Sequence, residues 1–213
     1  AQVVAEEIVA AGGVAIAVEM NVLDAGSVRA ARDTIVSELG DVDILLNGAG
    51  GNNPKGSTTK YNLTPEDMAL LEENGSIEGV KTFFDLDPDG ISFVFNLNFL
   101  GTLIPTQIFA RDMAKRGGNI INVSSMNSFR PLTRIPAYSG AKAAVSNFTQ
   151  WLAVHFAPVG IRVNAIAPGF FLTNQNRNLL LNADGSLSPR SEKILGHTPM
   201  GRFGVPEDLD GVL

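Results

Sequence analysis

The sequence predicts an α/β protein with a doubly wound parallel sheet. Segments with helical and strand character alternate along the chain, and the strand-like segments are continuous apolar runs followed by Gly- and Asn-rich stretches. Alternating helices and strands form parallel sheets, whose strands are buried on both faces and therefore apolar throughout. In such sheets a ligand binds beyond the carboxyl ends of the strands.

Helical periodicity and capping residues locate the expected helices. Asp24 suits the N-cap of one helix and Gly40 its C-terminal stop, while Gly12 and Gly13 end the first helix. A short helix is also expected after Thr64, and FDLDPDG is typical of a turn followed by a helix start. The other expected helices cover residues 1–11, 25–39, 90–115, 136–157 and about 189–195.

Four apolar runs are expected to form strands, and polar motifs follow three of them. The strands are residues 14–22, 42–47, 119–125 and 161–168, and the motifs are NGAGGNN, SSMNS and PGFFLTNQN. We expect these motifs to meet at one edge of the sheet, where they form a ligand site. Residues 169–205 are a long connection of the kind that is usually functional or mobile. No linker divides the chain, so we expect one domain over residues 1–213.

Composition excludes several classes of function. The net charge of −6 argues against a nucleic-acid partner, although a local Arg cluster can still bind an anionic substrate. With no Cys and two His, neither a disulfide framework nor a metal-ligand cluster is expected, and a reducing, cytoplasmic location fits. There is no signal peptide and no continuous apolar run of membrane-spanning length, so no membrane partner is expected.

Four residues are suited to proton-transfer chemistry: Ser125, Tyr138, Lys142 and Asn98. Tyr138 and Lys142 are four apart on one expected helix and share a face. A nearby ammonium is expected to lower the pKa of a tyrosine from its usual value near ~10, which suits proton exchange with an alcohol or ketone. Ser125 can orient the same substrate oxygen, and the Asn98 amide can hold a water beside Lys142.

A Tyr-x-x-x-Lys pair by itself is more often an ordinary surface pair. The functional interpretation depends on a coincidence of positions. Ser125 ends a strand thirteen residues before Tyr138, and both lie between two Gly- and Asn-rich strand-end loops.

Together, these residues resemble the short-chain dehydrogenase/reductase family over essentially the whole chain. The motifs are Asn47-Gly48-Ala49-Gly50, NLNFLGT around Asn98, NVSS ending at Ser125, YSGAK from Tyr138 to Lys142, and PGFFLT with Pro168, Gly169 and Thr173. The resemblance implies a Rossmann-like oxidoreductase that uses NAD or NADP. It also implies a catalytic tetrad of Asn98, Ser125, Tyr138 and Lys142, with Tyr138 as general acid/base.

The resemblance further implies a cofactor-binding set. Its members are Asn21, Val22, Asn47, Gly48, Ala49, Tyr138, Lys142, Pro168, Gly169 and Thr173. Asn21 stands where many members have Asp, but an Asn carbonyl can still accept from the adenine amino group. The residue that separates NAD from NADP is not in this sequence, and the resemblance favours NAD.

The family's Gly-x-x-x-Gly-x-Gly turn does not occur in these 213 residues. We therefore expect an incomplete doubly wound sheet, truncated at both ends, without its first two strands and its last strand. Residues 1–213 alone are expected to be unstable and to bind cofactor poorly, because the pyrophosphate lacks its helix N-terminus. A tight, stoichiometric NADH titration of these 213 residues contradicts this expectation.

Within the family, several strings resemble the bacterial D-mannonate oxidoreductases, also called fructuronate reductases. They include LLNGAGGNNPK, FDLDPDG and APGFFLTNQNR. The reaction implied is D-mannonate + NAD⁺ ⇌ D-fructuronate + NADH, and Arg suits the carboxylate of such a sugar acid. Candidate substrate residues on strand-end loops are Asn52, Asn127, Arg130, Arg134, Asn174 and Arg177, each of which can also be an ordinary solvated residue.

Two kinds of alternative remain open. One is a related reductase of gluconate-like acids or of a 3-oxoacyl thioester, and the other is a non-catalytic relative that only binds a nucleotide or a partner. The family usually forms homodimers or homotetramers through the helices expected at residues 90–115 and 136–157, whose apolar surfaces suit an interface.

Overall fold

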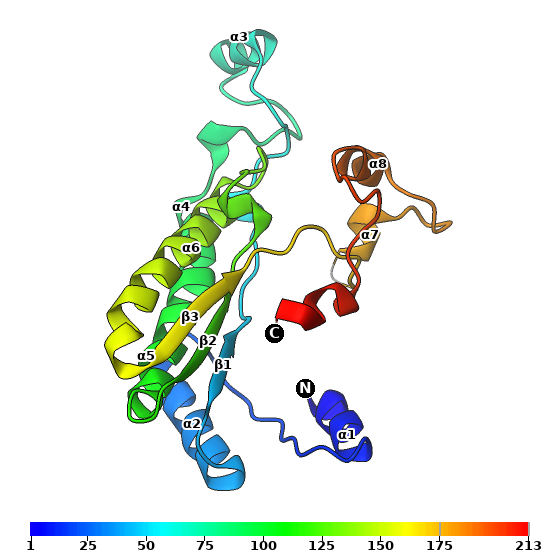
Figure 1. The fold of residues 1–213 in the computed structure, drawn as a ribbon. Helices are drawn as coiled ribbons and strands as arrows, with labels where there is room; N and C mark the ends of the chain where they lie inside the picture. The colour runs from blue at the N-terminus through cyan, green and yellow to red at the C-terminus, as the bar shows by residue number, and fades with distance from the viewer. Residues whose placement is uncertain (175, 213) are drawn as a thin grey trace. The chain divides into compact units, whose positions relative to one another are not determined.

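The computed structural model describes residues 1–174 and 176–212, which divide into two compact units, Ala1–Ile166 and Ala167–Leu213. The first unit contains a parallel sheet of three strands in the order β1-β2-β3 (Figure 1). The strands are β1 (Ile44–Asn47), β2 (Gly118–Val123) and β3 (Ile161–Ile166). The α/β fold with a parallel, partial sheet is therefore confirmed.

Helices connect these strands, and most begin and end where their caps predict. Asp24 caps α2 by accepting from the backbone N–H of Gly26 at 2.7 Å, and Thr64 forms a capping box at the start of α3. The helices of the first unit are α1 (Gln2–Ala10), α2 (Ala25–Leu39), η1 (Pro54–Gly56), α3 (Pro65–Asn74), η2 (Phe83–Asp85), α4 (Pro88–Phe95), η3 (Asn96–Leu100), α5 (Gly101–Met113), η4 (Met126–Ser128), α6 (Pro136–Phe156) and η5 (Ala157–Val159).

Helices α5 and α6 cover one face of the sheet, and the apolar core lies between them and the strands. The core joins Phe109 and Met113 of α5, Leu152 of α6, and Ile120 and Ile161 of the sheet. The opposite sheet face is open among the described residues, since the side chains of Ile44 and Leu46 are about half exposed. The expectation that both faces of the strands are covered is therefore wrong for this structure.

The strand expected at residues 14–22 does not form. This segment is extended but has no strand partner among the described residues, and Val14 is 81% exposed. A strand needs a neighbour for its backbone hydrogen bonds, and the sheet edge at β1 does not pair with residues 14–22. The apolar character of residues 14–22 therefore predicted a buried strand, but the described part of the chain does not bury this segment.

The expected helix at residues 90–115 runs from Pro88 to Met113 but contains a five-residue π-helical stretch, η3. Such a bulge widens the backbone locally and is common at functional sites. By length and composition alone the stretch Pro88–Met113 is apolar enough to cross a membrane. Its buried Thr102 and Thr106 and the packing of α5 on the sheet are typical of a core helix.

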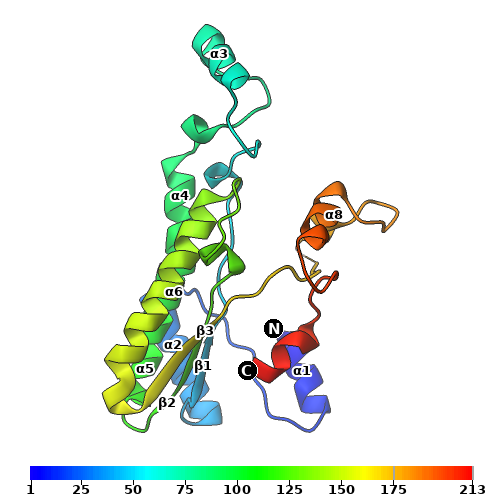
Figure 2. The same cartoon turned by 45° about the horizontal axis from the view of Figure 1, so that its top comes forward.

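Residues 52–87 form an excursion between β1 and α4, which we call the arm. It carries η1, α3 and η2, and α3 lies at its far end in both views (Figures 1 and 2). An ion pair between the partly exposed Lys60 and the buried Asp67 anchors the start of α3, and hydrogen bonds to Lys60 and the backbone of Thr64 lower the pKa of Asp67. The arm is thus an ordered substructure with its own polar contacts.

The second unit contains short elements joined by backbone and side-chain hydrogen bonds and by an ion pair between Arg202 and Asp208. The elements are α7 (Arg177–Leu180), α8 (Pro189–Gly196) and η6 (Pro206–Val212). Leu180 and Ser191 are buried against each other, and the Ser191 hydroxyl donates to the Leu180 carbonyl. The helix predicted around residues 189–195 is confirmed as α8, whereas α7 was not predicted.

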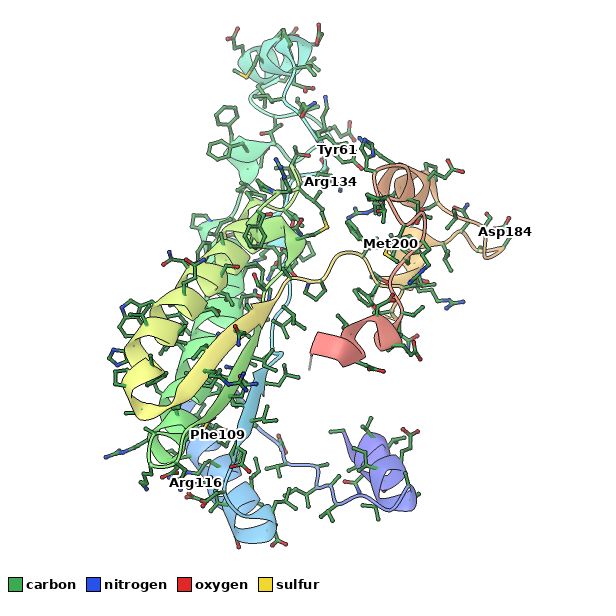
Figure 3. The ribbon with its side chains drawn as sticks, in the orientation of Figure 1. Tyr61, Phe109, Arg116, Arg134, Asp184 and Met200 are labelled. Atoms are coloured by element: carbon green, nitrogen blue, oxygen red, sulfur yellow. The ribbon has the colours of Figure 1, made fainter. Side chains whose placement is uncertain are left out.

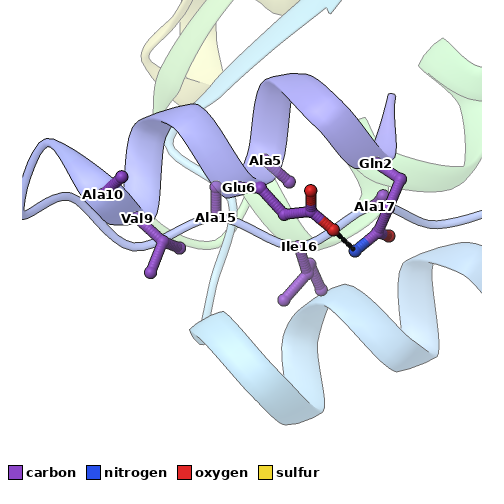
Figure 4. A pocket seen from close by; sticks show the side chains of 8 residues that line it. All are labelled: Gln2, Ala5, Glu6, Val9, Ala10, Ala15, Ile16 and Ala17. Carbon is purple, nitrogen blue, oxygen red and sulfur yellow. Dashed lines mark hydrogen bonds between the residues drawn. The ribbon is translucent and has the colours of Figure 1, made fainter.

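Helix α1 and the extended residues after it enclose a shallow hollow (Figure 4). It is lined mainly by alanines and by Val9 and Ile16, and its polar members Gln2 and Glu6 hydrogen-bond each other at 3.0 Å. No candidate site residue lines this hollow, so it plays no part in the site described next.

Candidate functional site

A buried chain of hydrogen bonds ties the carboxyl ends of β1 and β2 to the flanking helices. The amide of Asn47 donates to Oδ1 of Asn122 at 2.8 Å and to the hydroxyl of Thr106 on α5 at 3.0 Å. Asn122 in turn donates to the Thr149 hydroxyl on α6 at 2.9 Å. All four side chains are buried. The chain fixes the strand ends from which the site loops depart.

Ser124 and Ser125 follow β2 and have different partners. The Ser124 hydroxyl bonds to Ser146 at 2.6 Å and donates to the Lys142 carbonyl at 3.1 Å, which joins the strand end to α6. Ser125 caps η4, and its side chain hydrogen-bonds Tyr138. The structure thus brings Ser125 and Tyr138 together at the strand edge, as the sequence predicts.

Lys142 lies beneath Tyr138 on α6 and is almost fully buried. Its Nζ lies 5.8 Å from the centroid of the Tyr138 ring and donates to the Val123 carbonyl at 2.7 Å. Burial lowers the pKa of Lys142 to about 8. The lysine therefore stays mostly protonated at neutral pH but loses its proton more readily than an exposed lysine.

The electrostatic coupling expected from the sequence is not what the structure shows. Burial raises the pKa of the Tyr138 hydroxyl, and the hydrogen bond from Ser125 only partly offsets that effect. Lys142 does not lower the pKa of Tyr138 because its ammonium is directed at the Val123 carbonyl. The expectation of a tyrosine acidified by its lysine is therefore wrong for the protein alone.

Asn98 lies in the π-helical stretch and is fully buried. Its Nδ2 donates to the carbonyls of Gly51 at 2.7 Å and Val94 at 2.8 Å, and its Oδ1 accepts from the Gly51 backbone N–H at 3.3 Å. The amide is thus used to hold the loop after β1. The side chain thus positions the loop, and its expected role in holding a water beside Lys142 stays a prediction.

Gly50 brings the same loop against both Asn98 and Lys142. A Cβ at this position would lie 2.6 Å from Oδ1 of Asn98 and 3.1 Å from Nζ of Lys142. Its neighbour Gly48 has open space where a Cβ would stand. The loop therefore requires glycine at position 50, because a side chain there would collide with Asn98. Gly48 and the half-buried Ala49 instead border open space above the strand end.

Asn127 is the best-placed of the candidate substrate residues in the first unit. It lies in η4, is 7% exposed, and its backbone N–H donates to the Ser125 hydroxyl at 3.2 Å. Its Oδ1 is buried without a hydrogen-bond partner. Buried polar atoms are normally satisfied, so this oxygen fits a site completed by a bound hydroxyl or a water. Arg130, in contrast, is exposed on the following loop.

Two other candidate substrate residues, Asn52 and Arg134, lie at the base of the arm. Asn52 donates to the Ser57 hydroxyl at 3.0 Å within the arm. Arg134 donates through Nε to the carbonyl of Thr58 at 3.2 Å and lies over the ring of Tyr61. Both side chains thus have structural contacts that the sequence did not reveal.

Asn21 and Val22, expected at the adenine, lie in the segment before α2. The side-chain oxygen Oδ1 of Asn21 accepts from the backbone N–H of Leu23 at 3.0 Å and keeps a second lone pair, and Val22 packs on Gly101. The other half of the cofactor set, Pro168, Gly169 and Thr173, belongs to the second unit.

In the second unit the backbone N–H of Thr173 donates to the Asn176 side chain at 2.8 Å, and the Asn176 amide donates to the Phe171 carbonyl at 2.7 Å. The candidate residues Thr173, Asn174 and Arg177 are exposed. Gln175, which completes the NQN motif, lies outside the described residues. Asn176 thus organises the turn that carries the exposed candidates.

Sequence reasoning missed Thr106, Asn122 and Thr149, which join Asn47 in the buried hydrogen-bond chain. Asn122 lies in a strand otherwise expected to be apolar, and a polar residue there is a signal for a buried partner. The two threonines carry no such signal, because threonine is ordinary on a helix. Among the described residues no group of three or more His, Cys, Asp or Glu could hold a metal ion.

With this geometry established, comparison with known proteins identifies the family. The family model for short chain dehydrogenases matches residues 1–183. The chain belongs to the short-chain dehydrogenase family. Family members are NAD(P)-dependent oxidoreductases, which is the class of this chain.

Individual relatives show how close the similarity is. An uncharacterised oxidoreductase of Haemophilus influenzae is 56% identical over 211 residues, which cover 99% of this chain and 71% of the relative. The NAD-bound crystal structure of a candidate D-mannonate oxidoreductase from Haemophilus is 54% identical, with a TM-score of 0.89, and covers 99% of this chain and 72% of its own.

A more distant solved structure is a gluconate 5-dehydrogenase from Burkholderia cenocepacia in complex with NADP and tartrate. It is 29% identical, with a TM-score of 0.75, and the match covers all of this chain and 71% of that one. The fold is therefore shared between members that bind NAD and members that bind NADP.

The contact between Gly50, Asn98 and Lys142 predicts that Gly50→Ala destabilises the protein. Its Cβ would overlap the Asn98 side chain, so we expect the free energy of unfolding to fall by about 1–3 kcal/mol. Gly48→Ala is the matched control. Its Cβ meets open space, and we expect a change of less than about 1 kcal/mol. Urea denaturation measures both, and equal effects of the two substitutions would contradict the packing described.

Burial of Lys142 predicts a specific pH dependence of stability. Its folded pKa of about 8 lies below the ordinary 10.5, so above pH 8 the unfolded chain binds more protons here than the folded chain. The free energy of unfolding should therefore rise with pH between about 8 and the onset of tyrosine ionisation near ~10. Urea denaturation across this range should show the rise in the wild type and not in Lys142→Met. Lys115→Met, at an exposed lysine, is the control and should keep it.

Proposed function

We propose that this protein interconverts a secondary alcohol and a ketone on a sugar acid, with D-mannonate and D-fructuronate as the pair and NAD as the cofactor. The observation that carries the proposal is the hydrogen bond between the buried Ser125 and the partly buried Tyr138, above the buried Lys142 at the strand edge. Support for the substrate comes from the 54% identity to the NAD-bound Haemophilus structure.

Proton transfer is the task we assign to Tyr138. When the ketone is reduced, its hydroxyl gives a proton to the carbonyl oxygen, and in the reverse direction it accepts the alcohol proton. The side chain of Ser125 donates to the same oxygen and holds it against Tyr138. Because burial raises the pKa of Tyr138, the protonated form is the ready state, which suits the reducing direction.

Lys142 and Asn98 complete the proposed tetrad in different ways. Lys142 borders Gly50 and has an ammonium whose pKa is about 8, so it can pass a proton toward Tyr138 without retaining a fixed charge. Asn98 acts through position, because its amide holds the Gly51 backbone and thus the loop that Lys142 contacts. Its proposed role is therefore structural support for the proton-transfer pair.

The residues at this edge fit the nicotinamide half of a dinucleotide. When bound, the nicotinamide accepts or delivers the hydride. Open space over Gly48, the buried Lys142 and the unpaired Oδ1 of Asn127 are the features that fit. We assign Asn47 to the support of the loop, because its side-chain Nδ2 donates to Thr106 and Asn122. Asn21 and Val22 remain proposed adenine contacts.

For the substrate we propose that Asn127 binds a hydroxyl and Arg130 binds the carboxylate. Asn127 has a buried acceptor without a partner, and Arg130 is exposed on the loop that follows it. Residues 169–205, with Asn174 and Arg177, are proposed to supply further contacts, and the nicotinamide end is assigned to Pro168, Gly169 and Thr173. We further propose a cytoplasmic homo-oligomer as the working form.

A second candidate function is reduction of a gluconate-type acid. It is favoured by the similarity to the gluconate 5-dehydrogenase, whose structure contains tartrate, itself a hydroxy acid. Both candidates require a carboxylate site and have the reacting carbonyl at C5, counted from the carboxylate; they differ in the configuration at C2, the carbon next to the carboxylate.

Tyr138→Phe tests the proposed chemistry. Loss of the hydroxyl should lower kcat for D-fructuronate reduction by at least about 10²-fold, because the group that gives the proton is removed. NADH consumption measures the rate, and the dissociation constant for NADH, followed by its fluorescence, should change little. Unchanged turnover in Tyr138→Phe would show that the mechanism is wrong.

The same assay tests the substrate with a panel of ketoacids. D-Fructuronate should be reduced with a higher kcat/KM than 5-ketogluconate or an acetoacetyl thioester. Preference for 5-ketogluconate would replace the mannonate proposal with the gluconate-type one, and no turnover of D-fructuronate would refute the mannonate proposal outright.

A further inference from the structure

The two ends of the arm are hydrogen-bonded to each other. The backbone N–H of Thr59 donates to the Lys81 carbonyl at 2.9 Å, and the Lys81 N–H donates back to the Thr59 hydroxyl at 2.8 Å. A second link joins the Asp87 N–H to the Lys55 carbonyl at 3.2 Å. Because both ends are fastened together, a movement of one end moves the whole base of the arm.

This base packs on the start of α6, beside Tyr138. Gly56 is buried, and a Cβ there would lie 3.3 Å from the Ala137 Cβ and 3.2 Å from the Gly90 carbonyl oxygen. Ala137, the neighbour of Tyr138, is 3% exposed. The base of the arm therefore contacts the turn of helix that carries the proposed acid/base.

Arg134 fastens the same base through three contacts. Its carbonyl accepts from the Thr58 N–H at 2.9 Å, and its Nε donates to the Thr58 carbonyl at 3.2 Å, which makes a reciprocal pair. Its guanidinium carbon lies 5.6 Å from the centroid of the Tyr61 ring, which is within cation–π range (Figure 3). A bound guanidinium with a stacked face is held in one geometry.

These contacts change the interpretation of Arg134. A residue that binds a mobile substrate carboxylate keeps its guanidinium directed at the site, whereas here one N–H and one face are used by the arm. Arg130, four residues earlier, makes no side-chain hydrogen bond or ion pair that the described residues show. The two arginines of this loop therefore have different surroundings.

We propose that Arg134 is a positioning residue that fixes the arm against the segment leading into α6, and that the arm so held forms one wall of the substrate site. The inference deepens the proposed function, on which it rests for the substrate. Because such a wall would restrict the shape of the substrate and not recognise its charge, losing the wall lowers the activity on acidic and neutral substrates alike. A carboxylate ligand, in contrast, matters only for acids.

The test compares Arg134→Ala and Tyr61→Leu with wild type on D-fructuronate and on D-fructose, the ketose with a hydroxymethyl group in place of the carboxylate. Each variant should lower kcat/KM on both substrates by a similar factor, roughly tenfold and mainly through KM. The double variant should be little worse than either single one, because both substitutions break the same contact. Arg29→Ala, at an exposed arginine on α2, is the matched control and should leave both substrates unaffected.

A measurement without substrate separates this inference from the proposed function. Hydrogen exchange of the backbone amides of residues 57–61 should accelerate roughly tenfold in Arg134→Ala and in Tyr61→Leu, while the amides of β2 stay protected. Loss of activity on D-fructuronate alone, with unchanged exchange, would make Arg134 a carboxylate ligand and overturn the inference. Unchanged exchange and unchanged kinetics on both substrates would overturn it as well. If D-fructuronate is not a substrate at all, the exchange result still decides.

Discussion

The hydrogen bond between Asn47 and Asn122 is the contact on which the site depends. It joins the last paired residues of β1 and β2 and continues to Thr106 on α5 and Thr149 on α6. A buried amide must be satisfied, so these four side chains fix the two helices relative to the strand ends. Ser125 and the Gly48–Gly51 loop depart from those ends, which explains how separate strands deliver groups to one place.

Burial rather than charge pairing sets the ionisation of the proposed acid/base. It raises the pKa of Tyr138 and lowers that of Lys142 to about 8, so burial stabilises the neutral form of each side chain relative to water. At pH 7 the tyrosine is neutral and the lysine is still mostly protonated, but this lysine releases its proton more readily than an exposed one. Asn98 supports this arrangement from a distance by holding Gly51, so its contribution is to geometry and not to charge.

The arm adds to this core the proposed wall of the substrate site, on which the proposed specificity depends. Its base contacts Ala137, one residue from Tyr138, and Arg134 joins it to the loop that follows Ser125 and Asn127. Proton transfer and substrate shape are therefore assigned to adjoining but separate groups. A family that shares the tetrad can change its substrate through such an excursion, because the hydrogen bonds at the strand ends do not include the arm.

The sequence by itself determined the helices α2 and α6, the cap at Asp24 and a helix after Thr64, because local periodicity and caps act within a few residues. It also predicted that Ser125 and Tyr138 meet, because parallel strands bring their carboxyl ends to one edge of the sheet. Only the tertiary structure decided that residues 14–22 form no strand, that Lys142 faces the Val123 carbonyl, that Asn98 holds a loop, and that Arg134 fastens the arm. Each of these depends on a partner distant in sequence. The identity of such a partner is set by packing in space, which spacing along one chain does not encode.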